Sequence, residues 1–473
     1  MLGIQGMTGS LLFTVIMSAF GSGFQHGYNG VVVNPPQMVL EQWIRQVAGD
    51  RSGLAPEDVD DNTITWVWSG VVAVMCVGGM VGGATTGAVA QRFGRRGGLL
   101  VNNVLVFVAT AIYGTCKVAK SYEMFLIGRF IIGINNGLNT GLCPMYLSEI
   151  SPKLHRGAVG TLYELFVNLG GVLATVFGVQ AVLGTEKDWP YLFGLMSVPA
   201  AMQLVSLCFV PESPLHLLAS GAGDDTDARE ALMWLRDTDD VDEDLQELAS
   251  ELSPGERPML GLRELLAEPA LREPLVIALV VMASQQLAGI NVVMFYSTKI
   301  FVAADMSTRD AQLATLAVSV VKMLSVLVCT ALVDRAGRRP LLLAGYGGMC
   351  GSAVLLTVML LFVEQATWVR WLTALLLMLF ASSFSVGPGA IPWFLVDELF
   401  SHSARASASS AAVCLNWLCN FVVSMVFLPL QMVMHSYVFL IFVVLLVVFA
   451  FFVFAKLPET KKKPIIEITE LFE

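Results

Sequence analysis

The most constraining feature of this chain is an internal duplication. A basic string at residues 92–96, Arg-Phe-Gly-Arg-Arg, returns at residues 335–339 as Arg-Ala-Gly-Arg-Arg, about half a chain length later. Each copy lies between two long apolar runs. Internal repeats of this kind are typical of membrane carriers in which one half rocks against the other. We therefore expect two copies of one membrane unit.

The composition agrees with a membrane protein. Charged residues make up only 14% of the chain and hydrophobic residues 55%, whereas a soluble domain carries about 25% charged residues. A membrane helix needs about 20 apolar residues. We expect twelve such spans, near residues 10–33, 65–89, 97–117, 124–147, 158–182, 190–210, 273–298, 310–333, 341–363, 370–396, 406–428 and 436–456.

These spans predict an all-α membrane protein with two six-helix halves. The N-terminal half covers residues 1–210 and the C-terminal half residues 273–457. Between them, residues 211–272 form the one sizeable polar stretch, which we expect to be a small cytosolic helical domain, and residues 458–473 form a cytosolic tail. Within the polar stretch we expect short helices at Ala228–Arg236 (capped by Thr226), Asp244–Leu252 and Leu262–Leu266.

The basic residues predict the orientation. Lys and Arg cluster after the second, fourth, eighth and twelfth spans. An even number of spans places these clusters and both termini on one side, which the positive-inside rule identifies as the cytosol. We expect a multi-pass protein of the plasma membrane whose first span is an uncleaved anchor, with an external loop at residues 34–64.

Other function classes lack support in the sequence. The net charge of −10 reflects acids in two solvated segments, residues 57–61 and 224–251, and no feature indicates nucleic-acid binding. The eight cysteines fall in apolar spans, so neither a disulfide framework nor a metal site is expected. No nucleotide-binding string or catalytic cluster occurs. We expect a protein that is not an enzyme, needs no cofactor and functions as a monomer in the lipid bilayer.

A second duplicated motif combines acids with bases. Glu149 and Arg156 return as Glu398 and Arg405, with the same offset of 249 residues (398 − 149 and 405 − 156). Such charges at the cytosolic surface can pair when the halves close there and separate when they open. The alternative is an orientation signal alone. Further charges expected in this cytosolic gate are Arg95, Arg129, Glu212 and Arg338.

Polar residues inside spans usually face a cavity, because they are costly in lipid. Gln285, Gln286 and Asn291 offer the amides that suit sugar hydroxyls, and all three can face one cavity only if the helix breaks near Gly289. Helix–helix hydrogen bonds are the alternative role for such residues. Further candidates are Gln25, His26, Tyr28, Asn29, Phe295, Tyr296, Trp393, Asn416, Trp417 and Asn420.

Taken in order along the chain, these motifs are similar to those of the facilitative glucose transporter (GLUT) family, the sugar porter branch of the major facilitator superfamily. The motifs are Gly-Arg-Arg at 94–96 and 337–339, Pro-Glu-Ser-Pro at 211–214, Gln-Gln-Leu-x-Gly-Ile-Asn at 285–291, Gly-Pro-Gly-x-Ile-Pro-Trp-Phe at 387–394 and Pro-Glu-Thr-Lys at 458–461.

The resemblance implies alternating access around one hexose site. It implies sugar contacts from Gln285, Gln286, Asn291, Trp393 and Asn420, and an external gate at Phe295 and Tyr296. The resemblance also implies facilitative uniport. Gly-Tyr-Asn at 27–29 resembles fructose-preferring members, whereas Trp393 resembles glucose-preferring ones, so both sugars stay open.

Five positions depart from the family pattern. Glu164 and Lys322 stand where the family has Gln and Asn at the sugar site, and Leu215 replaces the Arg that follows Pro-Glu-Ser-Pro. Ser385 stands where glucose-preferring members have Glu, and Ala288 where the family usually has Ser.

Two opposite charges on facing walls of one cavity suggest a mutual salt bridge between Glu164 and Lys322 across the two halves, because an isolated charge at bilayer depth costs at least ~2.5–3.5 kcal/mol. The other readings are that either side chain reaches water, that Lys322 binds an anion, or that Glu164 couples protons. An organic-anion carrier using Lys322 and a sugar sensor with little transport are therefore the alternatives to hexose transport.

Overall fold

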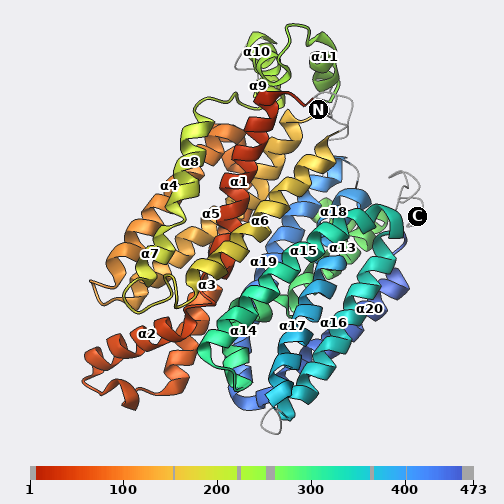
Figure 1. Ribbon diagram of the computed structural model, residues 1–473. Helices are drawn as coiled ribbons and strands as arrows, with labels where there is room; N and C mark the ends of the chain where they lie inside the picture. Colours follow the sequence, from red (N-terminus) through yellow and green to blue (C-terminus); the bar gives the residue numbers. More distant parts are fainter. Residues whose placement is uncertain are drawn as a thin grey trace.

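The apolar runs form long helices that lie side by side in two groups (Figure 1). The computed structural model describes residues 7–152, 155–220, 225–251, 262–362, 367–400 and 402–460. Those residues form helices and no strand, so the fold is all-α as predicted.

The first group holds the spans expected in the first part of the chain. Its helices are α1 (Gly9–Val31), α3 (Asp61–Phe93), α4 (Arg95–Cys116), α5 (Tyr122–Ile150), α6 (Arg156–Gly178) and the consecutive pair α7 (Trp189–Gly194) and α8 (Ser197–Leu207).

The second group holds the spans expected after the polar stretch. Its helices are α13 (Pro269–Leu287), α14 (Ile290–Ala303), α15 (Thr308–Ala336), α16 (Arg338–Leu361), α17 (Thr367–Val386), α18 (Ile391–Leu399), α19 (His402–Met434), the short η2 (His435–Val438) and α20 (Phe439–Lys456).

Each of the twelve predicted spans corresponds to a helix or a helix pair within the described residues. Judged by length and composition alone, nine stretches of that part of the chain could cross a membrane, and the stretch Ser407–Lys456 covers both α19 and α20. Helices α1 and α5 are not among these nine stretches, because polar side chains such as Gln25 and Arg129 lower their mean hydropathy. Both of those side chains are buried between helices, so they do not contact lipid.

Two spans are broken near their middle. Gly289, with φ +93°, separates α13 from α14, which confirms the predicted break. A Cβ atom there would lie 2.8 Å from Phe442 Cδ1 on α20, so both the conformation and the space favour glycine. The Gly-Pro-Gly string at 387–389 separates α17 from α18, because Pro388 cannot continue a regular helix.

Small residues allow α3 and α5 to approach closely. A Cβ atom on Gly82 would lie 2.2 Å from the carbonyl oxygen of Ile134, and one on Gly78 would lie 2.1 Å from that of Phe130. Glycines four residues apart on α3 therefore form the contact surface for α5, as expected for helices packed in lipid.

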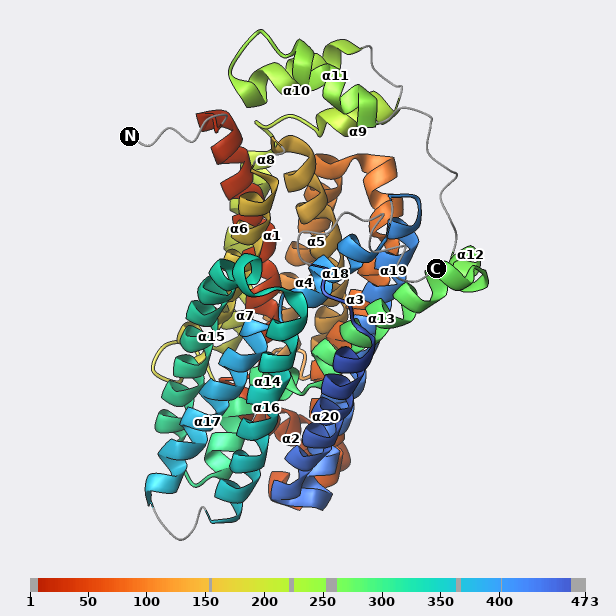
Figure 2. The same cartoon turned by 90° about the vertical axis from the view of Figure 1, so that its right-hand side faces the viewer.

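The polar stretch forms short helices beyond the end of the first group (Figure 2). These are α9 (Pro214–Ser220), α10 (Asp225–Arg236) and α11 (Asp242–Glu251), and α12 (Leu262–Ala267) follows beside α13. Thr226 lies inside α10 rather than capping it, because the helix begins at Asp225, three residues before the predicted start at Ala228. Thr8 donates to the carbonyl oxygen of Leu235 at 2.5 Å and so ties the start of α1 to α10.

The expected external loop contains a helix that the sequence analysis missed. Helix α2 (Gln37–Ser52) is followed by the short η1 (Pro56–Asp58). Four apolar residues recur at helical spacing on α2 and are buried, a pattern that would have predicted this amphipathic helix. They are Leu40, Trp43, Ile44 and Val47.

An exposed ion pair ties α2 to α5. Arg51 Nη2 lies 3.0 Å from Glu123 Oε2. The hydrogen bonds from Arg51 lower the pKa of Glu123 to about 2. A carboxylate with a lowered pKa contributes stability above its unfolded value and loses it as the pH falls through the folded value, so this contact is intact at neutral pH.

Candidate functional site

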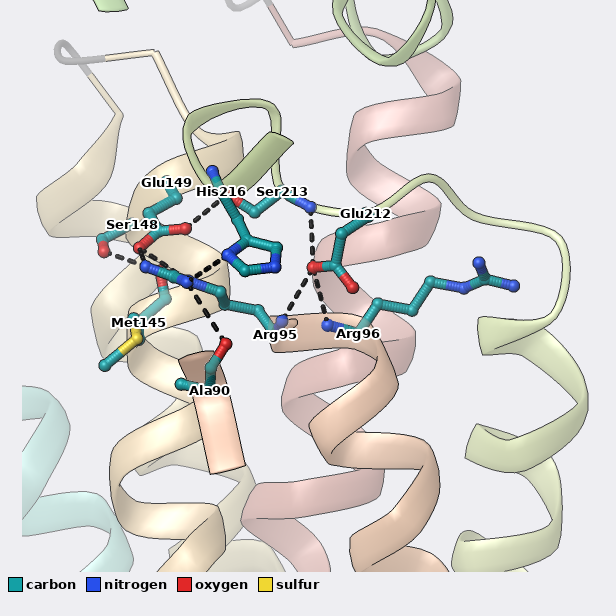
Figure 3. A network of polar contacts seen from close by, with 9 residues as sticks. All are labelled: Ala90, Arg95, Arg96, Met145, Ser148, Glu149, Glu212, Ser213 and His216. Carbon is teal, nitrogen blue, oxygen red and sulfur yellow. Dashed lines mark hydrogen bonds and ion pairs between the residues drawn. The ribbon is translucent and has the colours of Figure 1, made fainter. Parts of the chain in front are cut away.

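Both basic strings lie at one end of the bundle, because six spans separate them. We call this the basic end, and the opposite end, which carries α2, the α2 end. At the basic end of the first group, Arg95 Nη2 and Nε lie 2.8 and 3.0 Å from Glu149 Oε1 (Figure 3). Ser213 donates to the same carboxylate, and His216 Nδ1 lies 2.8 Å from Arg95 Nη1.

The second group repeats this arrangement. Arg338 Nη2 and Nε lie 2.7 and 3.0 Å from Glu398 Oε1, and Thr460 donates to Glu398 Oε2 at 2.5 Å. The ion-pair side chains are mostly buried, with exposures of 15% for Arg338 and 25% for Glu398. Partial burial and two donors make such a pair stronger than an exposed surface pair.

A second acid caps the helix that follows each basic string. Glu212 accepts hydrogen bonds from the backbone N–H groups of residues 95, 96 and 97 at 2.8, 2.9 and 3.2 Å. Glu459 accepts from those of residues 338 and 339 at 2.9 and 3.1 Å. Each carboxylate lies at the first turn of a helix, where unpaired N–H groups and the helix dipole favour negative charge.

The predicted gate residues are therefore only partly brought together. Arg95, Glu149 and Glu212 form one network in the first group, and Arg338 and Glu398 form its counterpart in the second. Arg405 Nη2 lies 3.4 Å from the carbonyl oxygen of Phe400 and makes further contacts. The side chain of Arg156 lies outside the described part of the chain. Opening and closing by these charges stays a prediction.

Arg129 does not belong to this network, and its assignment to the basic end is wrong. About 20 residues separate it from Glu149 on α5, which corresponds to roughly 30 Å along a helix. Arg129 is fully buried and donates to the carbonyl oxygens of Asn29 at 2.9 Å and Val71 at 3.3 Å. It links α5 to α1 and α3 toward the α2 end. The error arose from treating an arginine inside a span like those in loops.

The amides around the broken span meet in one cluster. Asn291 donates to Gln286 Oε1 across the break at Gly289. Gln286 Nε2 donates to Asn416 Oδ1 at 2.8 Å, and Asn416 Nδ2 donates to Gln285 Oε1 at 2.7 Å. Gln285 Nε2 reaches the carbonyl oxygen of Gly389 at 2.6 Å, at the second broken span. The four amides, defined here as the amide cluster, present donors and acceptors at the two helix breaks.

The other predicted sugar contacts lie on several elements. Asn420, on α19, accepts a hydrogen bond from Ser424 at 3.1 Å. Trp393, on α18, is partly buried against the core of the second group. His26, on α1, lies 3.1 Å from the Tyr163 hydroxyl on α6, a residue that the sequence analysis did not select.

Glu164 and Lys322 lie on α6 and α15, which pack against each other. Their charges interact electrostatically, and Lys322 also interacts with His26. No ion pair within 4.0 Å joins Glu164 to Lys322, both of which lie in the described part of the chain. Glu164 is exposed, Lys322 is half-buried, and Asn168 donates to Glu164 Oε1 at 3.4 Å. The proposed salt bridge is therefore not formed in this conformation.

The two groups are joined by hydrogen bonds at the α2 end. Asn34 Nδ2 donates to the carbonyl oxygen of Met294 and to Ser297 Oγ, both at 2.8 Å, and its Oδ1 accepts from the N–H of Thr298 at 3.2 Å. Gln312 Nε2 donates to the carbonyl oxygen of Pro35 at 3.1 Å. Asn34 is buried, so these bonds close this end of the molecule.

The predicted external gate residues lie next to this closure. Phe295 and Tyr296 are both buried on α14. Tyr296 donates to the carbonyl oxygen of Ser424 at 2.8 Å and stacks on Phe427, so it faces α19 of its own group. The first group instead contacts α14 through Asn34, which the sequence analysis missed. The sequence shows Asn34 only as one asparagine in a loop. Its three hydrogen bonds to α14 depend on how the two groups pack and could not be inferred from the sequence.

The comparisons with known proteins point in one direction. A family described as sugar (and other) transporter matches residues 14–472. The facilitated glucose transporter member 3 of Ovis aries is 39% identical over 473 residues, covering 100% of this chain and 94% of that protein. The facilitated glucose transporter member 1 of Gallus gallus is 41% identical over 467 residues, covering 98% of this chain and 94% of that protein.

Solved structures of the xylose transporter XylE from E. coli share the fold. Its partially occluded inward-open conformation has a TM-score of 0.80 at 26% identity, covering 96% of this chain and 100% of that chain. XylE bound to 6-bromo-6-deoxy-D-glucose has a TM-score of 0.77 at 27% identity. The repeated halves, the family match and these relatives lead to one conclusion: the chain belongs to the facilitative glucose transporter family, in the sugar porter branch of the major facilitator superfamily.

Proposed function

We propose that this protein carries a hexose, glucose or fructose, down its gradient by alternating access. The amide cluster at the two helix breaks carries the proposal. Gln285, Gln286, Asn291 and Asn416 can exchange their mutual hydrogen bonds for bonds to sugar hydroxyls. Interrupted helices that line a central site are the arrangement used by alternating-access carriers.

The relatives support transport rather than chemistry. Proteins named as facilitated glucose transporters match nearly the whole chain, and no energy source is needed when a sugar moves down its own gradient. Glucose and fructose differ in the placement of a few hydroxyls. The choice between them therefore depends on how the amide cluster, His26 and Trp393 meet those hydroxyls.

We further propose that the basic end faces the cytosol of a plasma-membrane protein. The first turns of α4 and α16 at that end carry Arg95, Arg96, Arg338 and Arg339, and basic residues next to membrane spans stay on the cytosolic side during insertion. The α2 end is then external. Its inter-group hydrogen bonds, and the similarity to inward-open XylE, support a conformation closed toward the outside.

We also propose that Glu164 and Lys322 form a salt bridge in the occluded state. Both charges sit on helices of opposite groups, interact electrostatically, and stand apart in this conformation. Closing the groups at the basic end would bring α6 and α15 together there and let the two side chains meet. Charges left apart in a closed, dry cavity would oppose closure.

The sugar site is tested by equilibrium binding to the purified protein. Gln286→Ala removes the amide that contacts both Asn291 and Asn416. We therefore expect the dissociation constant for the preferred hexose to rise at least tenfold. Scintillation proximity with labelled sugar measures it. Gln42→Ala, at an exposed position of α2, is the matched control. Equal affinities in both variants would place the sugar elsewhere.

A further inference from the structure

A groove opens at the basic end between the first turns of α13 and the last turns of α20. It has a volume of about 300 Å³ and is lined by Arg272, Glu273, Val276, Ile277, Phe452 and Lys456. It lies on the outer side of the second group, apart from the amide cluster. Phe451 and Phe454, its neighbours on α20, are 71% and 63% exposed, as expected for side chains that face lipid.

The groove is layered in the same way on both walls. Helix α13 runs away from the basic end and presents Arg272 first and Val276 about one turn deeper. Helix α20 runs toward the basic end and presents Phe452 first and Lys456 at its last residue. Although the helices run in opposite directions, both place a cation at the membrane surface and an apolar side chain beneath it.

The charges in the groove do not cancel. Lys456 Nζ donates to Glu273 Oε1 at 2.8 Å, so these two opposite charges form an ion pair. The guanidinium of Arg272 is exposed and has no hydrogen bond or ion pair to any described residue. One unpaired cation with five donors therefore remains, next to an ammonium that shares only part of its hydrogen-bonding capacity.

We propose that this groove binds a singly charged anionic glycerophospholipid from the adjoining leaflet. Its phosphate lies between Arg272 and Lys456, and one acyl chain lies along Val276 and Phe452. A planar guanidinium matches two phosphate oxygens, and basic pockets between helices on the cytosolic side recognise anionic headgroups. A zwitterionic lipid brings its own cation toward Arg272, and a free phosphate leaves the apolar wall uncovered.

The bound lipid would act on the helix that breaks at the sugar site. Helix α13 leads from Arg272 to the amide cluster, and α20 packs its Phe442 ring against Gly289 at the break. A headgroup that bridges Arg272 and Lys456 holds these helices together at their ends. We therefore expect the lipid to raise the melting temperature of the purified protein, whichever sugar it carries.

Native mass spectrometry of the delipidated protein tests the proposal, with dioleoyl phosphatidylglycerol, dioleoyl phosphatidylcholine and inorganic phosphate as probes. We expect retention of phosphatidylglycerol, about tenfold less of phosphatidylcholine, and no displacement by millimolar phosphate. Arg272→Gln should reduce phosphatidylglycerol retention about tenfold. Arg309→Gln, an exposed arginine of α15 at the α2 end, is the matched control and should change nothing.

A gain-of-affinity variant completes the test. Glu273→Gln releases Lys456 for the phosphate and should raise phosphatidylglycerol retention several-fold, even if Arg272→Gln fails to fold. Equal retention of the two lipids, displacement by inorganic phosphate, or equal retention in Arg272→Gln and Arg309→Gln would each overturn the assignment. So would unchanged retention in Glu273→Gln.

Discussion

Lys299 Nζ lies 2.9 Å from Glu41 Oε1, and this ion pair joins α14 of the second group to α2, the helix between α1 and α3. Gln37 Nε2 donates to the same carboxylate oxygen at 2.7 Å and so fixes its position. The two charged side chains are 33% and 19% exposed. The pair therefore lies beside the Asn34 contacts and fastens the α2 end in its closed conformation.

Removing this pair should shift the conformational equilibrium. A half-buried pair of this kind contributes about 1 kcal/mol, so Lys299→Met should raise the ratio of α2-end-open to α2-end-closed molecules about fivefold. Electron–electron distance measurements between spin labels at the exposed Asp58 and Arg309 report that ratio. Lys187→Met, at an exposed position of the same end, is the control. Identical distance distributions in the two variants would contradict the claim that the Lys299–Glu41 pair stabilises the closed α2 end.

Neutralising Lys322 alone should harm transport more than neutralising both charged residues. The single change Lys322→Asn leaves Glu164 without an opposite charge as the cavity closes, whereas Glu164→Gln with Lys322→Asn removes both charges. Both side chains reach water in this conformation, so an unpaired charge becomes costly only as the cavity closes. We therefore expect about a tenfold loss in initial uptake rate for the single variant and recovery of most of that rate in the double variant. A double variant as slow as the single one would refute the bridge.

The duplicated helix caps should contribute equally to stability. Glu459→Gln and Glu212→Gln each remove a carboxylate that accepts backbone N–H bonds at a helix N-terminus, so each should lower the free energy of unfolding by about 1–2 kcal/mol. Melting temperatures in detergent measure the effect, with the exposed Glu57→Gln as the reference substitution. A large effect in only one half would mean that the caps are not equivalent.

The contact between α1 and α6 provides a matched pair of glycine substitutions. A Cβ atom at Gly27 would lie 1.7 Å from the carbonyl oxygen of Val167, whereas one at Gly30 on the same helix would meet nothing within 4 Å. Gly27→Ala should therefore cost 3 kcal/mol or more, on the order of severe overpacking, and reduce the yield of folded protein. Gly30→Ala should leave the size-exclusion profile unchanged. Similar profiles for both variants would contradict the close approach of these helices.

Local signals explain which parts of the fold could be predicted. Spans follow from runs of apolar residues, and the break at Gly289 follows from requiring Gln286 and Asn291 to share one cavity. The amphipathic pattern of α2 was also present in the sequence but lay in a loop where no helix was sought. Glu459 was visible as a repeat of Glu212, since both follow a proline and precede a hydroxyl residue.

The remaining site features depend on tertiary contacts. Arg129 looks like any basic residue in the sequence, and only its burial against Asn29 and Val71 shows that it belongs to the α2 end. The orientation of Tyr296 toward Ser424 depends on how α14 packs on α19. The separation of Glu164 from Lys322 depends on the conformation adopted, which no residue pattern specifies.

Uptake of labelled glucose and fructose into sealed liposomes, without ion gradients or ATP, tests the central claim most directly. We predict saturable uptake of at least one of these sugars, competed by the same unlabelled sugar and abolished by Gln286→Ala with Asn291→Ala. Uptake that appears only with an imposed proton gradient would contradict uniport. Binding without uptake, or uptake of an organic anion in place of either sugar, would contradict hexose transport itself.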